Sequence, residues 1–227
     1  SGEYLESEDL SCLSFINCMF ENCTFTDCDF ERSSFVDVTF ISCDLSNSSL
    51  DSSYLSRCEF RSCKLVGAEF KDCSIQGVTF ESSNCGYAIF DKCKLSETQV
   101  KNSDMSSAEL VSCNLKAFKT SGSKYLGTSF FRTALGGVDF STCLVSGLRV
   151  SDTFRELRNA VFSANQAVEL SNAPWNKNKI ILAAMTINVT SGFLSLFILF
   201  YQYFHSVHRT VDTSCGVVAH IVFKVCL

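Results

Sequence analysis

The chain has 227 residues, of which 46% are hydrophobic, and a formal net charge of -5. It contains 21 Phe but only one Pro and one Trp, and a globular domain rarely spends so much of its apolar content on Phe. The composition therefore argues against an ordinary globule and favours stacked aromatic side chains. The negative net charge gives no sign of direct binding to nucleic acid.

The first residues are acidic and do not resemble a signal peptide. Residues 1–9 (SGEYLESED) are expected to form a short lead-in to the structure that follows. The first 20 residues contain no basic patch followed by an apolar run, so nothing there resembles a signal peptide.

Residues 10–150 repeat a pattern every five residues, without an insertion. The large apolar positions are Leu10, Phe15, Phe20, Phe25, Phe30, Phe35, Phe40, Leu45, Leu50, Leu55, Phe60, Leu65, Phe70, Ile75, Phe80, Cys85, Phe90, Leu95, Val100, Met105, Leu110, Leu115, Phe130, Leu135, Phe140, Val145 and Val150. The pattern falters at Thr120 and Tyr125. A small residue such as Cys18, Ser33 or Ala68 stands two positions before most of them. Such a constant frame indicates a repeat architecture.

A period of five fits neither the 3.6-residue helix nor the two-residue strand. It suits a chain that turns a corner every five residues, so that four corners close a coil of 20 residues. This pattern resembles the pentapeptide-repeat family, whose members form a right-handed quadrilateral β-helix. The resemblance implies an all-β solenoid over residues 10–150, with about seven coils stacked roughly 4.8 Å apart in a rod about 34 Å long. Phe20, Phe40, Phe60 and Phe80 are 20 residues apart and are expected to stack on one face.

Ten of the 14 cysteines occupy the small inward position, where Ala, Ser, Thr and Val also occur. They are Cys18, Cys23, Cys28, Cys43, Cys58, Cys63, Cys73, Cys93, Cys113 and Cys143. A residue that alternates with Ala and Val acts as a small hydrophobe, so we expect reduced core thiols. Reduced thiols favour a cytoplasmic location.

Charge is uneven along the repeat and gathers on one expected face. Residues 1–60 carry a net charge of -10, whereas residues 61–150 carry +3. We define the acidic stripe as the carboxylates beside Leu10, Phe30, Leu50, Phe70, Phe90 and Leu110. Its members are Asp9, Asp29, Glu31, Asp51, Glu69, Asp72, Asp91 and Glu109. The bases among them are Arg32, Lys71 and Lys92. The stripe is either an electrostatic docking surface for a basic partner or a device that keeps a Phe-rich rod soluble.

No catalytic, cofactor or metal motif occurs in the repeat. The histidines are His205, His208 and His220, all in the tail, and no zinc spacing, phosphate-binding glycine loop or nucleophile motif is present. The unbroken frame also leaves no projecting loops, which usually carry the active sites of β-solenoid enzymes. We expect a protein that is not an enzyme, with no cofactor and no metal.

After Val150 the spacing becomes helical over residues 151–171. Thr153 with Glu156, and Ser163 with Gln166, have capping-box spacing before apolar residues at helical intervals. We expect one or two short helices over the last coil.

The strings SGLRV and SANQAVELS are similar to the C-terminal end of Qnr-type quinolone-resistance pentapeptide proteins of Gram-positive bacteria. In that family the segment caps the coil and forms a two-fold dimer contact. The residues that would do so here are Gly147, Leu148, Val150, Gln166, Ala167, Val168 and Leu170. The resemblance implies a DNA mimic that binds a type II topoisomerase, DNA gyrase or topoisomerase IV, and protects it from quinolones. Qnr-type proteins tend to be more acidic along the whole rod than residues 61–150 are here.

Residues 172–227 depart from that family pattern and form an atypical apolar tail. Residues 180–204 contain no charge and are long enough to span a bilayer. Three interpretations stay open: a membrane anchor, a non-native continuation of the chain, or a buried capping hairpin. The alternative function is therefore a membrane-anchored structural or interaction rod with no topoisomerase partner.

Overall fold

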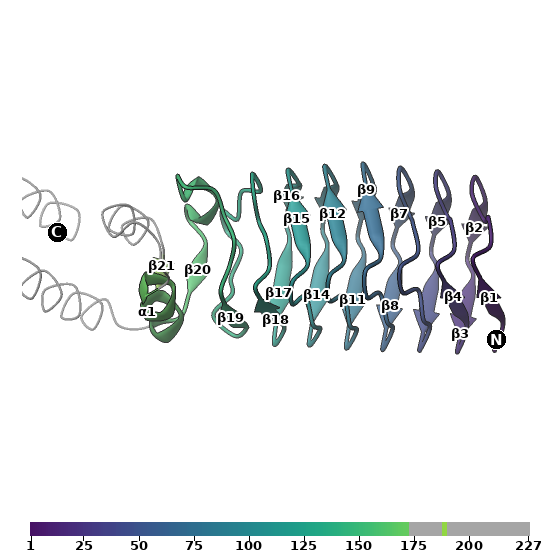
Figure 1. Ribbon diagram of the computed structural model, residues 1–227, viewed down its shortest axis with the longest axis horizontal. Helices are drawn as coiled ribbons and strands as arrows, with labels where there is room; N and C mark the ends of the chain where they lie inside the picture. Colours follow the sequence, from purple (N-terminus) through teal and green to yellow (C-terminus); the bar gives the residue numbers. More distant parts are fainter. Residues whose placement is uncertain (173–187, 190–227) are drawn as a thin grey trace, which may run out of the picture. The chain divides into compact units, whose positions relative to one another are not determined.

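The computed structural model describes residues 1–172 and 188–189. Three-residue strands wind into a parallel β-solenoid of about seven coils, in which most strands pair with the strand 20 residues further along the chain. The coils stack from β1, near the N-terminus, to β19 (Figure 1). The all-β quadrilateral fold predicted from the five-residue period is confirmed.

The solenoid has four faces, which we name after the first inward residue of each. The Phe15 face contains β2 (Ser14–Ile16), β5 (Ser34–Val36), β7 (Tyr54–Ser56), β10 (Ser74–Gln76), β13 (Lys94–Ser96) and β16 (Asn114–Lys116). The Phe20 face contains β3 (Met19–Glu21), β6 (Thr39–Ile41), β8 (Glu59–Arg61), β11 (Thr79–Glu81), β14 (Gln99–Lys101) and β17 (Lys119–Ser121).

The other two faces combine strands with single β-bridges. The Leu10 face contains β9 (Glu69–Lys71), β12 (Ile89–Asp91) and β15 (Glu109–Val111), continued by bridges through Asp29 and Ser49. The Leu5 face contains β1 (Tyr4–Glu6), β4 (Thr24–Thr26), β18 (Lys124–Leu126) and β19 (Leu144–Ser146). Because β1 pairs with β4, Leu5 already lies in the coil frame, within the expected lead-in of residues 1–9.

The corners explain why the chain turns every five residues. Each fifth residue from Ser7 to Gly137 has a positive φ, so one left-handed residue follows every strand-like segment. Most of these corner residues are not glycine, and Ser, Asn and Asp are frequent among them. Asn and Asp tolerate this conformation better than most residues, which favours a corner at these positions.

Stacked side chains fill the core. Phe60 lies between Phe40 and Phe80, with ring centroids 4.8 and 5.0 Å away and nearly parallel planes, and Phe20 stacks on Phe40 at 5.1 Å. The predicted Phe20–Phe80 column is therefore confirmed. All 12 cysteines within the described part of the chain are free. Several inward thiols donate to a backbone carbonyl of the preceding coil, as Cys58 does to Phe35 at 3.3 Å.

The solenoid opens on two of its faces near its C-terminal end. On the Phe15 and Phe20 faces, no backbone hydrogen bond within the described residues joins residues 114–121 to residues 134–141. On the other two faces the coils stay paired, through β18 with β19 and through Ser129 with Arg149. We call this one-sided opening the wedge.

Residues 151–162 do not form the helix that their spacing predicts. Residues Arg155–Leu157 form a single 3₁₀ turn, η1, and Val161–Phe162 form strand β20. The backbone N–H groups of Leu135 and Phe140 donate to the carbonyls of Glu156 and Val161, at 2.8 Å each. This segment therefore continues the coil, because the last coil has backbone groups that need partners.

The second predicted helix is present as α1 (Ala164–Asn172). Its capping box is formed, because Ser163 N–H donates to Gln166 Oε1 at 2.7 Å and Gln166 N–H donates to Ser163 Oγ at 3.4 Å. Strand β20 pairs with β21 (Asn188–Val189).

The predicted span of residues 180–204 lies outside the described residues, apart from positions 188–189. Among the helices of the described part, none is both long and apolar enough to cross a membrane.

Candidate interaction surface

The acidic stripe lies on the Leu10 face, in columns that the sheet register fixes. Asp9 is bridged to Asp29, Asp29 to Ser49 and Ser49 to Glu69. Glu69 and Glu109 both pair with Ile89, so these residues form one outward column on one side of the inward residues. Glu31, Asp51 and Asp91 follow the inward residues and lie on their other side, and Asp72 occupies a corner.

Bases on the same face neutralise much of the stripe. Lys71 Nζ lies 3.6 Å from Asp51 Oδ2 and also contacts Glu69. Lys92 lies 3.5 Å from Asp91, and Arg32 lies 3.6 Å from Glu31. Glu109 also has an ion pair, with a base described in the next paragraph. Five of the eight carboxylates are therefore paired.

Arg149 is a stripe residue that the sequence analysis missed. Its Nη2 lies 3.4 Å from Glu109 Oε1, and its Nε donates to the Gly127 carbonyl at 3.1 Å. Arg149 follows Glu109 by 40 residues, which is two coils, so extending the column beyond Leu115 would have found it.

The carboxylates without an ion pair among the described residues are Asp9, Asp29 and Asp72. Asp9 Oδ1 accepts the Ser11 N–H at 2.9 Å, and Asp29 Oδ1 accepts the Glu31 N–H at 2.8 Å. The hydrogen bonds from Ser11 lower the pKa of Asp9. Two of these three unpaired carboxylates, Asp9 and Asp29, therefore lie in the first two coils, and Asp72 lies in the fourth.

Burial acts differently on the central carboxylate Asp51. Desolvation raises the pKa of Asp51, despite the opposing contacts with Lys71. The hydrogen bond to Glu69 raises the pKa of Lys71. No metal-binding cluster occurs among the described residues.

The expected cap residues gather at the end of the solenoid. Leu148 is buried, Val150 and Ala167 are half-buried, and Leu170 is buried on α1. Gly147 has a φ of 61°, and a Cβ there would lie 3.7 Å from Gly127 N. Of Val168, only the backbone within α1 is described.

Gln166 and Glu156 close the end of the coil. The Gln166 Nε2 donates to the carbonyls of Phe140, at 2.9 Å, and Cys143, at 2.5 Å. The buried Glu156 accepts the Arg132 N–H at 3.0 Å and the Ser151 hydroxyl at 2.8 Å. Glu156 was expected to cap its own helix through Thr153, and instead it binds the neighbouring coil.

A family model described as a pentapeptide repeat region matches residues 9–90 and 33–110. Residues 9–110 are therefore a pentapeptide-repeat region, and the coils they form are a pentapeptide-repeat β-helix.

Solved structures of repeat proteins match at low similarity. A trypsin-treated variant of QnrB1, a plasmid-mediated fluoroquinolone resistance protein, is 22% identical, with coverage of 73% of this chain and 93% of that chain and a TM-score of 0.41. HetL, involved in heterocyst differentiation regulation in the cyanobacterium Nostoc sp. strain PCC 7120, is 14% identical, with coverage of 68% and 85% and a TM-score of 0.28. Among curated proteins, no sequence matches the chain. The assignment rests on the family model and on the coils themselves.

Proposed function

We propose that this protein is a non-enzymatic DNA mimic that binds DNA gyrase or topoisomerase IV through the acidic stripe and protects the enzyme from quinolones. The observation that carries the proposal is a column of carboxylates held in register on one face of a rigid solenoid. The resemblance of the SGLRV and SANQAVELS strings to Qnr-type proteins suggests the biological setting.

The spacing of the carboxylates supports mimicry of a phosphate backbone. Eight carboxylates over six coils, at about 4.8 Å a coil, give roughly one carboxylate per 3.6 Å. One strand of B-DNA presents one phosphate per about 3.4 Å of helix axis. A groove lined with Arg and Lys that accepts DNA could therefore accept this face.

The ion pairs on the stripe do not remove it from use. Their side chains are between 25% and 63% exposed, and exposed ion pairs contribute about 0–1 kcal/mol. A basic partner can displace Lys71 or Arg149 at little cost. Asp9 and Asp29, which have no such pair, are then the first contacts.

The experiment measures DNA supercoiling by purified gyrase in the presence of a fluoroquinolone, with the full chain added. We expect the concentration needed for half-inhibition to rise with the wild-type protein. The triple variant Asp29→Lys, Glu31→Lys and Asp51→Lys should lose this protection. A matched triple variant on other parts of the rod, Glu21→Lys, Glu81→Lys and Glu97→Lys, should keep most of it.

Equal protection by both triple variants would contradict the assignment to the stripe, provided that circular dichroism shows both to be folded. Absence of protection by the wild type, together with recovery of the protein in membranes, would favour the membrane-anchored rod instead. Recovery in the soluble cytoplasmic fraction is what the proposal expects.

We further propose a homodimer formed through the C-terminal end, where Leu148 and Leu170 close the solenoid. Sedimentation velocity should show a dimer. Ala167→Arg, at a half-buried helix position, should shift the protein to monomer while the circular dichroism spectrum is unchanged.

A further inference from the structure

The wedge exposes backbone groups that a complete solenoid would use. In the preceding coil pair, Lys119 N–H donates to the Thr98 carbonyl at 2.9 Å, and Asn102 N–H donates to the Ser121 carbonyl. The same register one coil further would join Asp139 N–H to the Phe118 carbonyl and Gly122 N–H to the Ser141 carbonyl. Neither bond is formed.

Two backbone N–H groups at this edge donate to side-chain oxygens instead of to the backbone of a neighbouring coil. Gly122 N–H donates to the Thr142 hydroxyl at 3.4 Å, and Ser141 N–H donates to Asp139 Oδ1 at 2.8 Å. The Thr120 N–H has no hydrogen-bond acceptor within the described chain. Strand β17 is therefore an unpaired edge inside an otherwise continuous solenoid.

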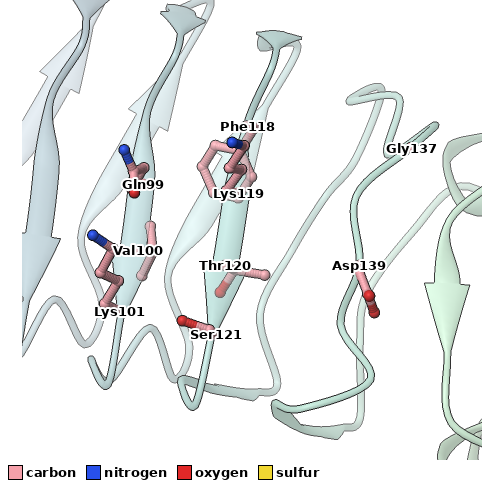
Figure 2. A pocket seen from close by; sticks show the side chains of 9 residues that line it. All are labelled: Gln99, Val100, Lys101, Phe118, Lys119, Thr120, Ser121, Gly137 and Asp139. Atoms are coloured by element: carbon pink, nitrogen blue, oxygen red, sulfur yellow. The ribbon is translucent and has the colours of Figure 1, made fainter.

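The opening follows from two side chains of unusual size: a large one where most repeats have a small one, and a small one where most repeats have a large one. Phe118 is buried at an inward position that is small in most other repeats, and Thr120 replaces a large apolar residue. The extra ring and the missing one prevent the next coil from stacking at the usual distance. Figure 2 shows β14 and β17 side by side and the separate trace through Gly137 and Asp139.

A cavity of about 300 Å³ lies at this edge. Residues from β14 and β17 form one side, including Lys101, Phe118 and Lys119, and Gly137 and Asp139 form the other. A Cβ at Gly137 would have no heavy atom within 4 Å, so this side leaves open space. The cavity therefore combines an apolar floor with two open backbone edges.

The charge at the wedge is positive. Lys101 and Lys119 line the cavity and have no ion pair among the described residues, and neither do Lys94 and Lys116 on the adjoining Phe15 face. The acidic group facing them in the cavity lining, Asp139, already accepts the Ser141 N–H. Glu97 occupies the corner between β13 and β14.

We propose that the wedge binds an extended acidic polypeptide segment by β-strand addition to β17. The Phe118 carbonyl and the Thr120 N–H would form hydrogen bonds with the backbone of the segment. Acidic side chains at every second residue of the segment would contact Lys101 and Lys119. Strand addition supplies affinity through the main chain and specificity through alternate side chains. The site is independent of the acidic stripe, which lies on the Leu10 face and attracts basic groups.

The experiment uses the full chain and a fluorescent nine-residue peptide of alternating Glu and Val. We expect saturable binding in fluorescence anisotropy, and at least tenfold weaker binding of the matching Lys and Val peptide. The double variant Lys101→Glu and Lys119→Glu should weaken binding of the acidic peptide at least tenfold. The matched double variant Lys64→Glu and Lys124→Glu, on the Leu5 face, should change it less than twofold.

A second ligand separates strand addition from simple charge attraction. The same peptide N-methylated at alternate residues, on its ladder-forming edge, should lose at least tenfold in affinity. Amide hydrogen exchange of Thr120 should slow when the unmodified peptide is bound.

Equal binding of the methylated and unmodified peptides, or an unchanged Thr120 exchange rate at saturation, would overturn the proposal. It would also be overturned if the acidic peptide did not bind while the protein self-associated through Lys101 and Lys119, because the occupant would then be a second copy.

Discussion

The buried Tyr125 hydroxyl donates to Thr120 Oγ1 at 2.8 Å. These are the two positions at which the five-residue apolar pattern falters, and they are partners in the core. Thr120 Oγ1 also lies 3.5 Å from Cys143 Sγ. Desolvation by burial raises the pKa of Tyr125. A hydroxyl at position 120 thus allows a tyrosine to occupy an inward position five residues later.

Thr120→Val should destabilise the protein, because it leaves the Tyr125 hydroxyl buried without its partner. The expected loss in the free energy of unfolding is about 1–3 kcal/mol. Urea denaturation followed by circular dichroism measures it. Adding Tyr125→Phe should restore part of the loss, and a double variant as unstable as Thr120→Val alone would contradict the pairing.

Phe60→Ala should cost about 3–5 kcal/mol, since the ring lies fully buried between Phe40 and Phe80. Removing it weakens two coil interfaces at once, and each coil depends on its neighbours. Phe20→Ala is the control, because Phe20 is only partly buried in the first coil and should cost less. Equal shifts in the urea midpoint would show that the column does not act through stacking.

Ala117→Gly should stabilise the protein by up to about 1 kcal/mol, because Ala117 has a φ of 53° and a Cβ disfavours that conformation. The greater flexibility of glycine in the unfolded chain offsets part of the gain. The control Ala108→Gly, at a buried inward position, should instead destabilise by about 1 kcal/mol. Thermal melting compares the two variants, and a lower midpoint for Ala117→Gly would contradict the corner assignment.

The fold could be predicted because one local rule, repeated every five residues, determines which side chains point inward. The end of the solenoid could not. Phe154, Leu157 and Val161 have helical spacing, yet η1 and β20 follow the coil because Leu135 and Phe140 offer N–H groups to that segment. The need to accept these hydrogen bonds comes from residues some 20 positions earlier, so the spacing of nearby residues cannot predict it.

The 20-residue spacing likewise predicted the positions of the acidic-stripe carboxylates along the coils. It did not predict the ion pairs that neutralise several of them. Arg149 pairs with Glu109 across two coils, and the direction of Lys71 toward Asp51 and Glu69 depends on side-chain packing. The wedge also escaped the sequence analysis. Its signal was Phe118 at an inward position that is small in most repeats, next to the irregularity at Thr120.

The pair of Asp37 and Arg57 gives a pH-dependent prediction. Arg57 Nε and Nη2 donate to the two oxygens of Asp37 at 2.6 and 2.7 Å, and this hydrogen bonding lowers the pKa of Asp37. A carboxyl with a lowered native pKa stabilises the fold above its unfolded pKa, and that contribution disappears as the pH falls through the native pKa. In an NMR titration, Arg57→Gln should raise the Asp37 pKa toward its ordinary value; an unchanged pKa would exclude Arg57 as the cause.

The most direct test of the proposed function is competition between this 227-residue chain and a labelled linear DNA for purified gyrase, followed by fluorescence anisotropy at several salt concentrations. The account predicts that the protein displaces the DNA, that displacement weakens steeply as salt rises, and that Asp9→Lys with Asp29→Lys abolishes it. Simultaneous binding of protein and DNA to gyrase, or displacement that survives the loss of both carboxylates, would contradict DNA mimicry by the acidic stripe.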